Sequence, residues 1–575
     1  MKIVVTGYGI ISAIGKNAQE TLISLKEEKS GIDKMKILES KHNFLPIGEI
    51  PFNNDSLKTQ LNIPAGEPIS RTSLLGIKAA REALTHANIT DTSKLAFLSG
   101  TTVGGMDTTE QHFTDWASEK NMEYIHLHEA GNSTTNIAKY LGDFAYMTTP
   151  STACSSALNS IIFGVNLILS GKVQQVLAGG SECLTKFHLN GFNSLMILDK
   201  EKCKPFDKNR AGLNLGEGAA YLVIESEDSA INRGANIIAY ISGFANTCDA
   251  YHQTATSPNG DGPFSAMSSA LSMAELISSD IDYINTHGTG TQNNDQSEST
   301  AMIRLFNEKM PYISSTKSFT GHTTSASGGI ESVISLLALE NNFVPANIRW
   351  TTQDDNTITP VKQTLKCNLN NVLCNSFGFG GNCSSIIFSK SNPNNSLPSP
   401  KDINYSILAS VELTENVDYK PYISVLEARR LTPQMRQTLV AAKQAMLQSG
   451  LTNVDAIITG SRWGCMINSV KFLSNMLESN EQSLNPTHFM QSTHNTMSSI
   501  IAIHLDCHAY NNTYSHGVDS FNDALLDAKT QMQLGLIKSA LIIGFDEVDN
   551  TWQSHLAKIN DAMTNVAKAI VISVN

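Results

Sequence analysis

The sequence predicts an α/β protein in which one unit is repeated, and three observations lead to this prediction. Short apolar runs that end in glycine, such as VQQVLAGGSE at residues 173–182, alternate with helical stretches. Such runs are typical of strands in a sheet that helices cover on both faces. The residues after 405 repeat a pattern from the first half of the chain, and the stretch before them, SKSNPNNSLPSPKD (389–402), is rich in Ser, Asn and Pro. That composition predicts a linker between the two copies.

The chain begins with an apolar segment, MKIVVTGYGI, that glycines at positions 7 and 9 interrupt. We therefore expect a strand at residues 2–6, a turn and then a helix, and not a signal peptide. A second helix is predicted around residues 77–84, because Ile77, Ala80 and Leu84 fall on one helical face. No apolar stretch approaches the roughly 18 residues of a membrane span.

Three segments of the first half recur in order near the C-terminus. The matching pairs are AREALTHANI (80–89) with AKQAMLQSGL (442–451), AFLSGTTVGGM (96–106) with AIITGSRWGCM (456–466), and LSGKVQQVLAGGSE (169–182) with QLGLIKSALIIGFDE (533–547). The last pair aligns Gly171 with Gly535, an offset of 364 residues, and the other two have offsets of 362 and 360. The C-terminal segment is therefore predicted to be a second copy of the N-terminal half.

Composition excludes several classes of protein. With 41% hydrophobic and 16% charged residues, the chain is typical of a globular enzyme and not of a disordered protein. A net charge of −12 without a basic run argues against nucleic acid as the main partner. The nine cysteines form no CxxC pair, which indicates reduced thiols and a cytoplasmic protein without a zinc site or a disulfide framework.

One cysteine stands at a predicted turn from strand to helix. STACSS (151–156) is followed at once by the apolar stretch ALNSIIFGVNLIL, so Cys154 lies where a helix begins. A single cysteine among small residues is more often a buried structural residue than a nucleophile. His287 and His322, however, each lie in a Gly/Thr/Ser-rich loop after an apparent strand. Open α/β sheets place their functional sites in such loops.

Five ordered motifs carry a resemblance to a known family. They are TACSSA (152–157), KPFDKNRAGLNLGEGAA (204–220), NTHGTGTQNND (285–295), SSTKSFTGHTTSASGGIES (314–332) and NSFGFGGN (375–382). In these motifs residues 1 to about 390 resemble a β-ketoacyl-acyl carrier protein synthase, the elongating condensing enzyme with a Cys-His-His triad. The resemblance implies a thiolase-like condensing-enzyme fold, with duplicated βαβαβαββ halves in α/β/α/β/α layers, and here a third, C-terminal half-domain.

The resemblance also assigns roles to residues. Cys154 matches the nucleophile that accepts the acyl chain, and His287 and His322 match the two catalytic histidines. The chemistry asks for these residue types, because a thiolate is both a good nucleophile and a good leaving group. The positive end of a helix dipole is expected to lower the pKa of Cys154. Two imidazole N–H groups can stabilise the enolate that forms when malonyl thioester loses carbon dioxide, so no metal or cofactor is expected.

Four more residues are expected to support this site. Lys317 is expected to act with the triad and to pair with Glu331, although a buried ion pair without a chemical role is an equally good interpretation. Phe379 matches the aromatic residue that gates acyl entry, and its backbone N–H and that of Cys154 are candidates for an oxyanion hole.

The motif FDKNR supplies Asp207 and Arg210, which we interpret as a structural ion pair.

Rival condensing enzymes differ from this chain at the same motifs. A biosynthetic thiolase resembles the fold but has a second reactive cysteine near NSFGFGG, and initiating synthases resemble a Cys-His-Asn pattern. Elongation on an acyl carrier protein is therefore the predicted reaction, with the carrier in its acyl- and malonyl-loaded forms as partner. Where the family carries basic carrier-docking residues, this chain offers Arg71 alone, with Met196 at a common arginine position and Lys204 before PFD. These departures put the usual fatty-acid carrier in doubt as the partner.

The C-terminal copy lacks the reaction. The offset of 364 residues aligns Val518 with Cys154, and no counterpart of either histidine loop follows; His516 nearby is interpreted as surface or turn chemistry. The copy resembles the half-length chain-length factors of aryl polyene and flexirubin-type pathways. We expect residues 405–575 to pack against residues 1–245 as a pseudo-dimer, within one chain or between two swapped chains. A homodimer is also possible, and Val518 is expected near the end of the acyl tunnel.

The predicted domains and function follow from these motifs. The expected domains are 1–245 with the nucleophile, 246–388 with both histidines, 389–404 as linker, and 405–575 as an inactive half-domain. The predicted function is decarboxylative Claisen condensation of malonyl-carrier with an acyl chain on Cys154, in polyene or polyketide-type elongation. The alternatives are general fatty-acid elongation with a stabilising extra domain, and a non-catalytic scaffold or chain-length factor in which Cys154 is idle.

Overall fold

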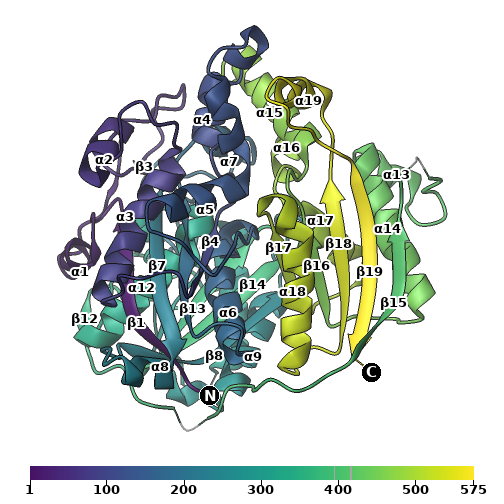
Figure 1. The fold of residues 1–575 in the computed structure, drawn as a ribbon. Coiled ribbons are helices and arrows are strands. Elements are labelled where there is room, and N and C mark those ends of the chain that lie inside the picture. The colour runs from purple at the N-terminus through teal and green to yellow at the C-terminus, as the bar shows by residue number, and fades with distance from the viewer. Residues whose placement is uncertain (308, 394, 415–416, 575) are drawn as a thin grey trace.

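Two sheets organise the molecule in the computed structural model, which describes residues 1–307, 309–393, 395–414 and 417–574. The larger sheet has the strand order β10-β9-β13-β14-β8-β1-β7-β6-β4-β5, and the smaller has the order β15-β19-β18-β16-β17. The first comes from residues 3–389, and residues 1–389 are here called the main body. The second comes from the C-terminal half-domain (residues 405–575). Figure 1 shows the main body on the left and the half-domain on the right.

The strands have the following bounds. In the large sheet they are β1 (Ile3–Ser12), β4 (Leu95–Gly100), β5 (Tyr146–Thr148), β6 (Gln175–Glu182), β7 (Gly218–Ser226), β8 (Ala239–Cys248), β9 (Tyr283–Asn285), β10 (Tyr312–Ser314), β13 (Asn371–Gly378) and β14 (Asn382–Ser389). In the small sheet they are β15 (Tyr405–Glu412), β16 (Ala456–Gly460), β17 (Tyr510–Tyr514), β18 (Ser539–Asp546) and β19 (Val566–Val574). Two short hairpins pair β2 (Ile32–Asp33) with β3 (Ile47–Gly48) and β11 (Phe343–Val344) with β12 (Leu365–Lys366).

The helices divide in the same way. Those of the main body are α1 (Ala18–Lys26), α2 (Asn54–Leu61), α3 (Arg71–His86), α4 (Met106–His112), α5 (Ala130–Lys139), α6 (Ser156–Leu169), α7 (Lys186–Ser194), α8 (Glu227–Asn232), α9 (Asp261–Ala274), α10 (Gln292–Leu305), α11 (Lys317–Thr320) and α12 (Ser327–Asn341). Those of the half-domain are α13 (Val425–Ala428), α14 (Pro433–Ser449), α15 (Met466–Glu478), α16 (Pro486–Met490), α17 (Thr496–Leu505), α18 (Ser520–Gln533) and α19 (Asn550–Ala557). No helix in the described ranges is long and apolar enough to cross a membrane.

The main body is built in five layers. Helices α6 and α12 form the central layer, because they contact strands β6 and β7 on one side and β13 and β14 on the other. Helix α3 covers the outer face of the first set of strands, and α9 covers the outer face of the second. Nearly every side chain of α6 and α12 is buried, as expected for helices enclosed between two sets of strands of the large sheet. These layers match the α/β/α/β/α arrangement that the sequence predicts.

The half-domain repeats one half of the main body strand by strand. Its order β15-β19-β18-β16-β17 has the same sense as β1-β7-β6-β4-β5, and in both orders the first two pairs are antiparallel and the last two are parallel. Helix α14 packs on this sheet as α3 packs on the larger one, and α18 occupies the place of α6. The repeat read from the sequence therefore corresponds to a repeat in three dimensions.

The half-domain packs against the main body within the same chain. At the facing sheet edges the Ser151 N–H donates to the Thr513 carbonyl and the Ser515 N–H donates to the Thr149 carbonyl, both at 2.8 Å. One apolar core runs across the junction, and in it the rings of Phe163 and Tyr514 lie 5.3 Å apart.

The junction also contains ion pairs and an ordered connecting segment. Arg462 of the half-domain pairs with Glu129 of the main body at 3.0 Å and with Asp561 at 2.8 Å. The segment between the two units runs along the lower edge of the molecule in Figure 1 and is anchored there, since Leu397 is buried and the Lys401 N–H donates to the Gln533 carbonyl. The predicted linker includes residue 394, which lies outside the described residues.

Candidate active site

The nucleophile candidate lies on a sharp, strained turn. Cys154 is the middle residue of a 3-10 turn, Ala153–Ser155, directly before α6. Ala153 has a φ of 52°, which a residue with a side chain adopts only when its surroundings impose it. The Ser156 hydroxyl stabilises the turn by accepting from the Thr152 N–H and donating to the Ala153 carbonyl. Cys154 is 5% exposed, so its thiol meets solvent only through a cavity.

Both predicted histidines converge on this thiol. His322, which follows α11, places Nε2 3.1 Å from Sγ of Cys154, and its Nδ1 lies 2.9 Å from the Ser327 hydroxyl. His287, which follows β9, lies with its ring centroid 5.3 Å from that of His322. One ring nitrogen of each histidine and Sγ of Cys154 lie within 4.8 Å of one another. Residues far apart in the sequence therefore form one compact group.

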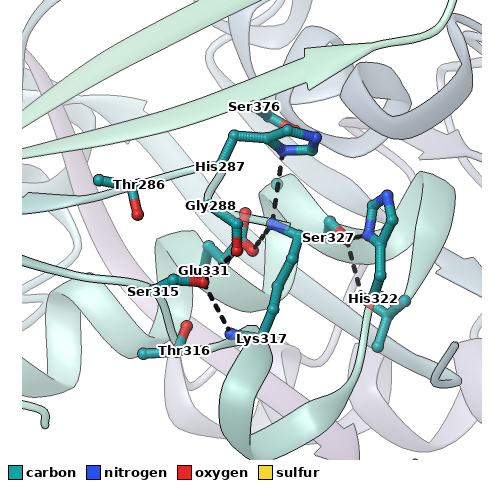
Figure 2. A network of polar contacts seen from close by, with 12 residues as sticks. Thr286, His287, Gly288, Ser315, Thr316, Lys317, His322, Ser327, Glu331 and Ser376 are labelled. Atoms are coloured by element: carbon teal, nitrogen blue, oxygen red, sulfur yellow. Dashed lines mark hydrogen bonds and ion pairs between the residues drawn. The ribbon is translucent and has the colours of Figure 1, made fainter. Parts of the chain in front are cut away.

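A buried ion pair stands behind the histidines, as Figure 2 shows. Lys317 Nζ contacts the Glu331 carboxylate, and it lies 3.4 Å from Nδ1 of His287. The side chains of Lys317 and Glu331 are 2% and 3% exposed. Burial raises the pKa of Glu331 to about 7 against the opposing effect of the Lys317 charge. The pairing predicted from the sequence is present, and it touches His287 directly.

Burial dominates the protonation of the three reactive groups. It raises the pKa of the Cys154 thiol to about 11, although the charge of Lys317 and the backbone N–H of Phe379 act in the opposite direction. It lowers the pKa of His287 and His322 well below 6.5, and the charge of Lys317 lowers both further. The pKa of Cys154 is therefore not lowered as the helix-dipole argument predicts, because loss of hydration outweighs the dipole. Both imidazoles are neutral at pH 7.

A cavity of about 390 Å³ leads to the triad. Cys154, His287 and His322 line its inner end, and Met196, which is 89% exposed, lies at its rim. A second cavity of about 30 Å³ is lined by Cys154 and by Phe489 and Met490 of the half-domain.

The second cavity is narrow because aromatic rings fill its path. Phe379 stacks on Phe192 at 5.7 Å, and Phe192 contacts Phe489 at 5.4 Å.

The Phe379 turn joins β13 to β14 beside the thiol. Gly380 and Gly381 have φ values of 89° and 79°, a conformation that only glycine adopts readily. The Gly380 N–H donates to the Gln253 carbonyl, and the Phe379 carbonyl accepts from the side-chain amide of Asn495 in the half-domain. The backbone N–H of Phe379 faces the Cys154 thiol.

The structure separates Asp207 from its predicted partner. Arg210 donates to Asp354 at 2.7 Å and lies 3.7 Å from Asp295, and it reaches Asp207 only at the backbone carbonyl. The Asp207 carboxylate accepts the N–H groups of Thr351 and Thr352 instead. The predicted pair is wrong, because both side chains serve the 351–354 loop, which lies far away in the sequence.

Two further expectations are corrected. Val518 occupies the position in the half-domain that Cys154 occupies in the main body, in the turn Gly517–Asp519, but its side chain is 80% exposed and lies outside both cavities. The residues of the half-domain that line the smaller cavity are in and after α16, where the sequence shows no motif. Arg71 cannot serve as a docking residue, because it is buried and paired with Glu217 at 2.6 Å.

Sequence reasoning also missed residues that hold the site in place. Glu298 accepts the backbone N–H groups of His287 and Gly288, at 2.9 and 2.8 Å, and so shapes the first histidine loop. Ser327 orients His322, and Asn495 holds the Phe379 turn. Glu298 lies only a few residues after the histidine motif, so an acidic residue at that place is the sequence signal that could have indicated its role in holding the loop.

The thiol and the two imidazoles are of the types that bind zinc, and their atoms are close enough together to do so. The Lys317 ammonium 3.4 Å from His287 Nδ1 opposes a divalent cation there. The donor set therefore suits neutral hydrogen-bond donors better than a resident metal.

Family models match most of the chain. The description "Beta-ketoacyl synthase, N-terminal domain" matches residues 1–230, and "Beta-ketoacyl synthase, C-terminal domain" matches residues 238–351. A second N-terminal-domain model of the same description matches residues 410–574. A 3-oxoacyl-[acyl-carrier-protein] synthase 2 of Staphylococcus aureus is 31% identical over 410 residues, which cover 68% of this chain and 98% of the relative.

Solved structures agree with this similarity. The ishigamide ketosynthase/chain length factor is 29% identical, with a TM-score of 0.64 over 68% of this chain and 99% of that one. The PfaC keto synthase-chain length factor superposes on 100% of this chain and 78% of its own, with a TM-score of 0.82. At 17% identity the second likeness concerns the fold alone, and it includes the half-domain.

Proposed function

The chain belongs to the beta-ketoacyl synthase family, and from that premise we propose that Cys154, His287 and His322 carry out its decarboxylative condensation beside a built-in chain-length factor. The protein is a condensing enzyme, an acyltransferase with the thiolase-like fold. The observation that carries the proposal for the site is the convergence of the thiol and the two imidazoles at the inner end of the large cavity.

The first step is transfer of the acyl chain to Cys154. The sulfur attacks the carbonyl carbon of the acyl-carrier thioester, and the backbone N–H groups of Cys154 and Phe379 stabilise the resulting oxyanion. Because burial keeps the thiol protonated, its proton passes to His322 Nε2, 3.1 Å away, and then to the departing carrier thiolate. The Ser327 hydroxyl both donates and accepts, so it supports either neutral tautomer of His322.

The second step consumes malonyl-carrier. The bond to the carboxylate breaks, carbon dioxide leaves, and the electron pair forms an enolate whose oxygen accepts from His287 and His322. Neutral imidazoles suit this role, because the one N–H group of each ring donates a hydrogen bond to the enolate oxygen and keeps its proton. The enolate carbon attacks the acyl-cysteine, the carbon–sulfur bond breaks, and β-ketoacyl-carrier leaves. The Cys154 thiolate released in this step takes up one proton from water, which restores the thiol. Burial lowers the pKa of both imidazoles and keeps them neutral, and the charge of Lys317, which is paired with Glu331, adds to this effect.

An acyl carrier protein, acyl- or malonyl-loaded, is the proposed partner at the cavity mouth. The S. aureus relative names such a carrier as its substrate. In this chain the exposed Lys200, Lys202 and Lys208 flank the cavity-lining residues Ile197 and Ala211 in the sequence. These lysines would attract an acidic carrier although Arg71 is buried. Nine free cysteines suit a reducing compartment, so we also propose a cytoplasmic location.

The half-domain is proposed to bound the acyl tunnel. Phe489 and Met490 close the smaller cavity where the partner subunit would stand in a symmetric dimer of main bodies. The ishigamide ketosynthase/chain length factor, at 29% identity, supports polyene or polyketide-type elongation. General fatty-acid elongation is the second candidate, because the S. aureus relative covers the main body alone.

Intact mass measurement after incubation with acyl-carrier and malonyl-carrier tests the proposal. Wild-type enzyme should gain one acyl group on Cys154 and form β-ketoacyl-carrier. Cys154→Ala should lose both while keeping part of the malonyl decarboxylation, because the histidines stabilise the enolate without the thiol. Cys367→Ala, which changes a half-buried cysteine remote from the triad motifs, is the control and should behave as wild type. Condensation by Cys154→Ala would refute the assignment.

A further inference from the structure

The half-domain contributes a hydrogen bond to the catalytic loop of the main body. The side-chain amide of Asn495 donates to the carbonyl of Phe379 at 2.8 Å. Asn495 is 3% exposed, and a Cβ on Gly380 would lie 2.7 Å from its nitrogen. The Phe379 turn and Asn495 therefore lie so close together that a side chain at position 380 would collide with the amide.

The side chain of Asn495 does not cap its own helix, as an asparagine at the N-cap position usually does. It is the N-cap residue of α17, yet its side chain makes no hydrogen bond to that helix. Three other asparagine N-caps, Asn17, Asn53 and Asn485, each accept an N–H from their own helix. Among the described residues, Oδ1 of Asn495 has no hydrogen-bond partner although it is buried. A buried amide that forgoes its helix for a distant carbonyl indicates a role at that carbonyl.

The internal repeat points the same way. The sequence HE at 128–129 before α5 corresponds to HN at 494–495 before α17, so Glu129 is the counterpart of Asn495. Glu129 also reaches across the junction, but it pairs with Arg462. Glu129 therefore contacts Arg462 and approaches Gly517 of the half-domain, where Asn495 contacts the Phe379 turn. At this position of the repeat, the copy that contacts the Phe379 turn therefore carries an amide, Asn495, and the copy that contacts Arg462 carries a carboxylate, Glu129.

We propose that Asn495 is a positioning residue for the Phe379 turn, through which the half-domain holds the oxyanion-hole N–H against Cys154. The proposal rests on the function proposed for Cys154. Phe379 presents its N–H to the thiol and its carbonyl to Asn495, so the amide fixes the orientation of the residue that serves the first step. The second step depends on His287 and His322, which Asn495 does not touch.

Two rates separate positioning from a merely structural role. Acylation of Cys154 by acyl-carrier, followed by intact mass in single turnover, uses the oxyanion hole. Release of carbon dioxide from malonyl-carrier by unacylated enzyme uses the histidines. Asn495→Ala should slow acylation about tenfold, as expected for one lost buried hydrogen bond, and leave decarboxylation within about twofold of wild type.

Two more variants complete the test. Asn495→Asp is isosteric but presents an acceptor to the Phe379 carbonyl, so it should match Asn495→Ala and serves if the alanine variant does not fold. Asn485→Ala, which removes an exposed N-cap in the same half-domain, should change neither rate. Acylation within about twofold of wild type in both Asn495 variants, or an equal fall in both rates, would overturn the proposal. If wild-type enzyme is not acylated, the role of Cys154 fails first and this proposal with it.

Discussion

At the scale of single residues, burial decides which proton sits where. The thiol of Cys154 and the rings of His287 and His322 are each 5% exposed or less, and their charged forms are therefore disfavoured. Lys317 supplies a positive charge among them, and Glu331 compensates it within the protein. A neutral triad next to a compensated charge suits hydrogen-bond donation to an enolate.

Alanine substitutions of the two histidines should affect different steps of the reaction. His287→Ala should slow malonyl decarboxylation by about a hundredfold or more, the typical loss for one donor to a developing oxyanion, and leave acylation of Cys154 near wild type. His322→Ala should slow both steps, because its Nε2 lies 3.1 Å from the thiol. Carbon dioxide release and intact mass measure the two steps. Normal decarboxylation with lost acylation in both variants would reverse the assigned roles.

The protonated thiol predicts a pH dependence. With its folded pKa raised to about 11, Cys154 is mostly thiol at neutral pH, and the thiolate fraction rises about tenfold per pH unit below that value. The rate of alkylation of Cys154 by iodoacetamide, followed by intact mass, should rise about tenfold per unit between about pH 7 and pH 9. The Cys154→Ala variant gives the background rate at other cysteines. A rate that is flat over this range would mean that the thiolate is already formed at pH 7.

At the scale of elements, short segments between the regular helices build the tunnel. The strands and long helices of both units are common to the repeat, whereas α16 places Phe489 between Phe192 of the main body and Phe472 of the half-domain. A Cβ on Gly191 would lie 2.1 Å from the Phe489 ring, so α7 and α16 pack directly on each other. The proposed end of the tunnel is thus a contact between two helices of different units.

Phe489→Ala should lengthen the products. Loss of the ring opens the cavity of about 30 Å³ toward Phe472 and admits a longer acyl chain, while it destabilises the fold by about 3–5 kcal/mol as for other buried phenylalanines. Mass spectrometry of released products and denaturant unfolding measure the two effects. Val518→Ala changes an exposed side chain and is the matched control, with no expected change in chain length. An unchanged product distribution in Phe489→Ala would exclude α16 from length control.

At the scale of the whole molecule, one chain supplies both sides of a pseudo-dimer. The sheets meet edge to edge at Ser151 and Ser515, the core crosses the junction, and Arg462 joins the two units by one ion pair, with Glu129. The half-domain therefore covers an apolar face of the main body.

Deletion of residues 405–575 should expose this surface. The truncated chain should aggregate, form a homodimer through the exposed face or lose condensation activity, because a large apolar patch seldom stays exposed in a monomer. Light scattering and the product assay measure these outcomes, with the Arg462→Ala full-length chain as a milder test of the same junction. A monomeric, fully active truncation with unchanged products would show that the half-domain is dispensable.

The sequence by itself determined the family, the repeat and the residues proposed for catalysis. Cys154, His287 and His322 each lie within a contiguous motif, and the physical requirement behind each motif is local: a tight turn, a flexible loop, glycines at positive φ. The second copy was also visible in the sequence, as matching segments at nearly constant offsets. Strand and helix patterns are local, so short windows of sequence are enough to recognise them.

Only the tertiary structure decided the partners of these residues. Arg210 pairs with Asp354 and not with its near neighbour Asp207, and the half-domain lines the smaller cavity with Phe489 and not with Val518. Burial reverses the expected shift in the pKa of Cys154, since hydration depends on everything packed around the thiol. The hydrogen bond from Asn495 to Phe379 joins residues 116 positions apart in different units. Such contacts depend on how separate elements pack, and no short stretch of sequence contains that information.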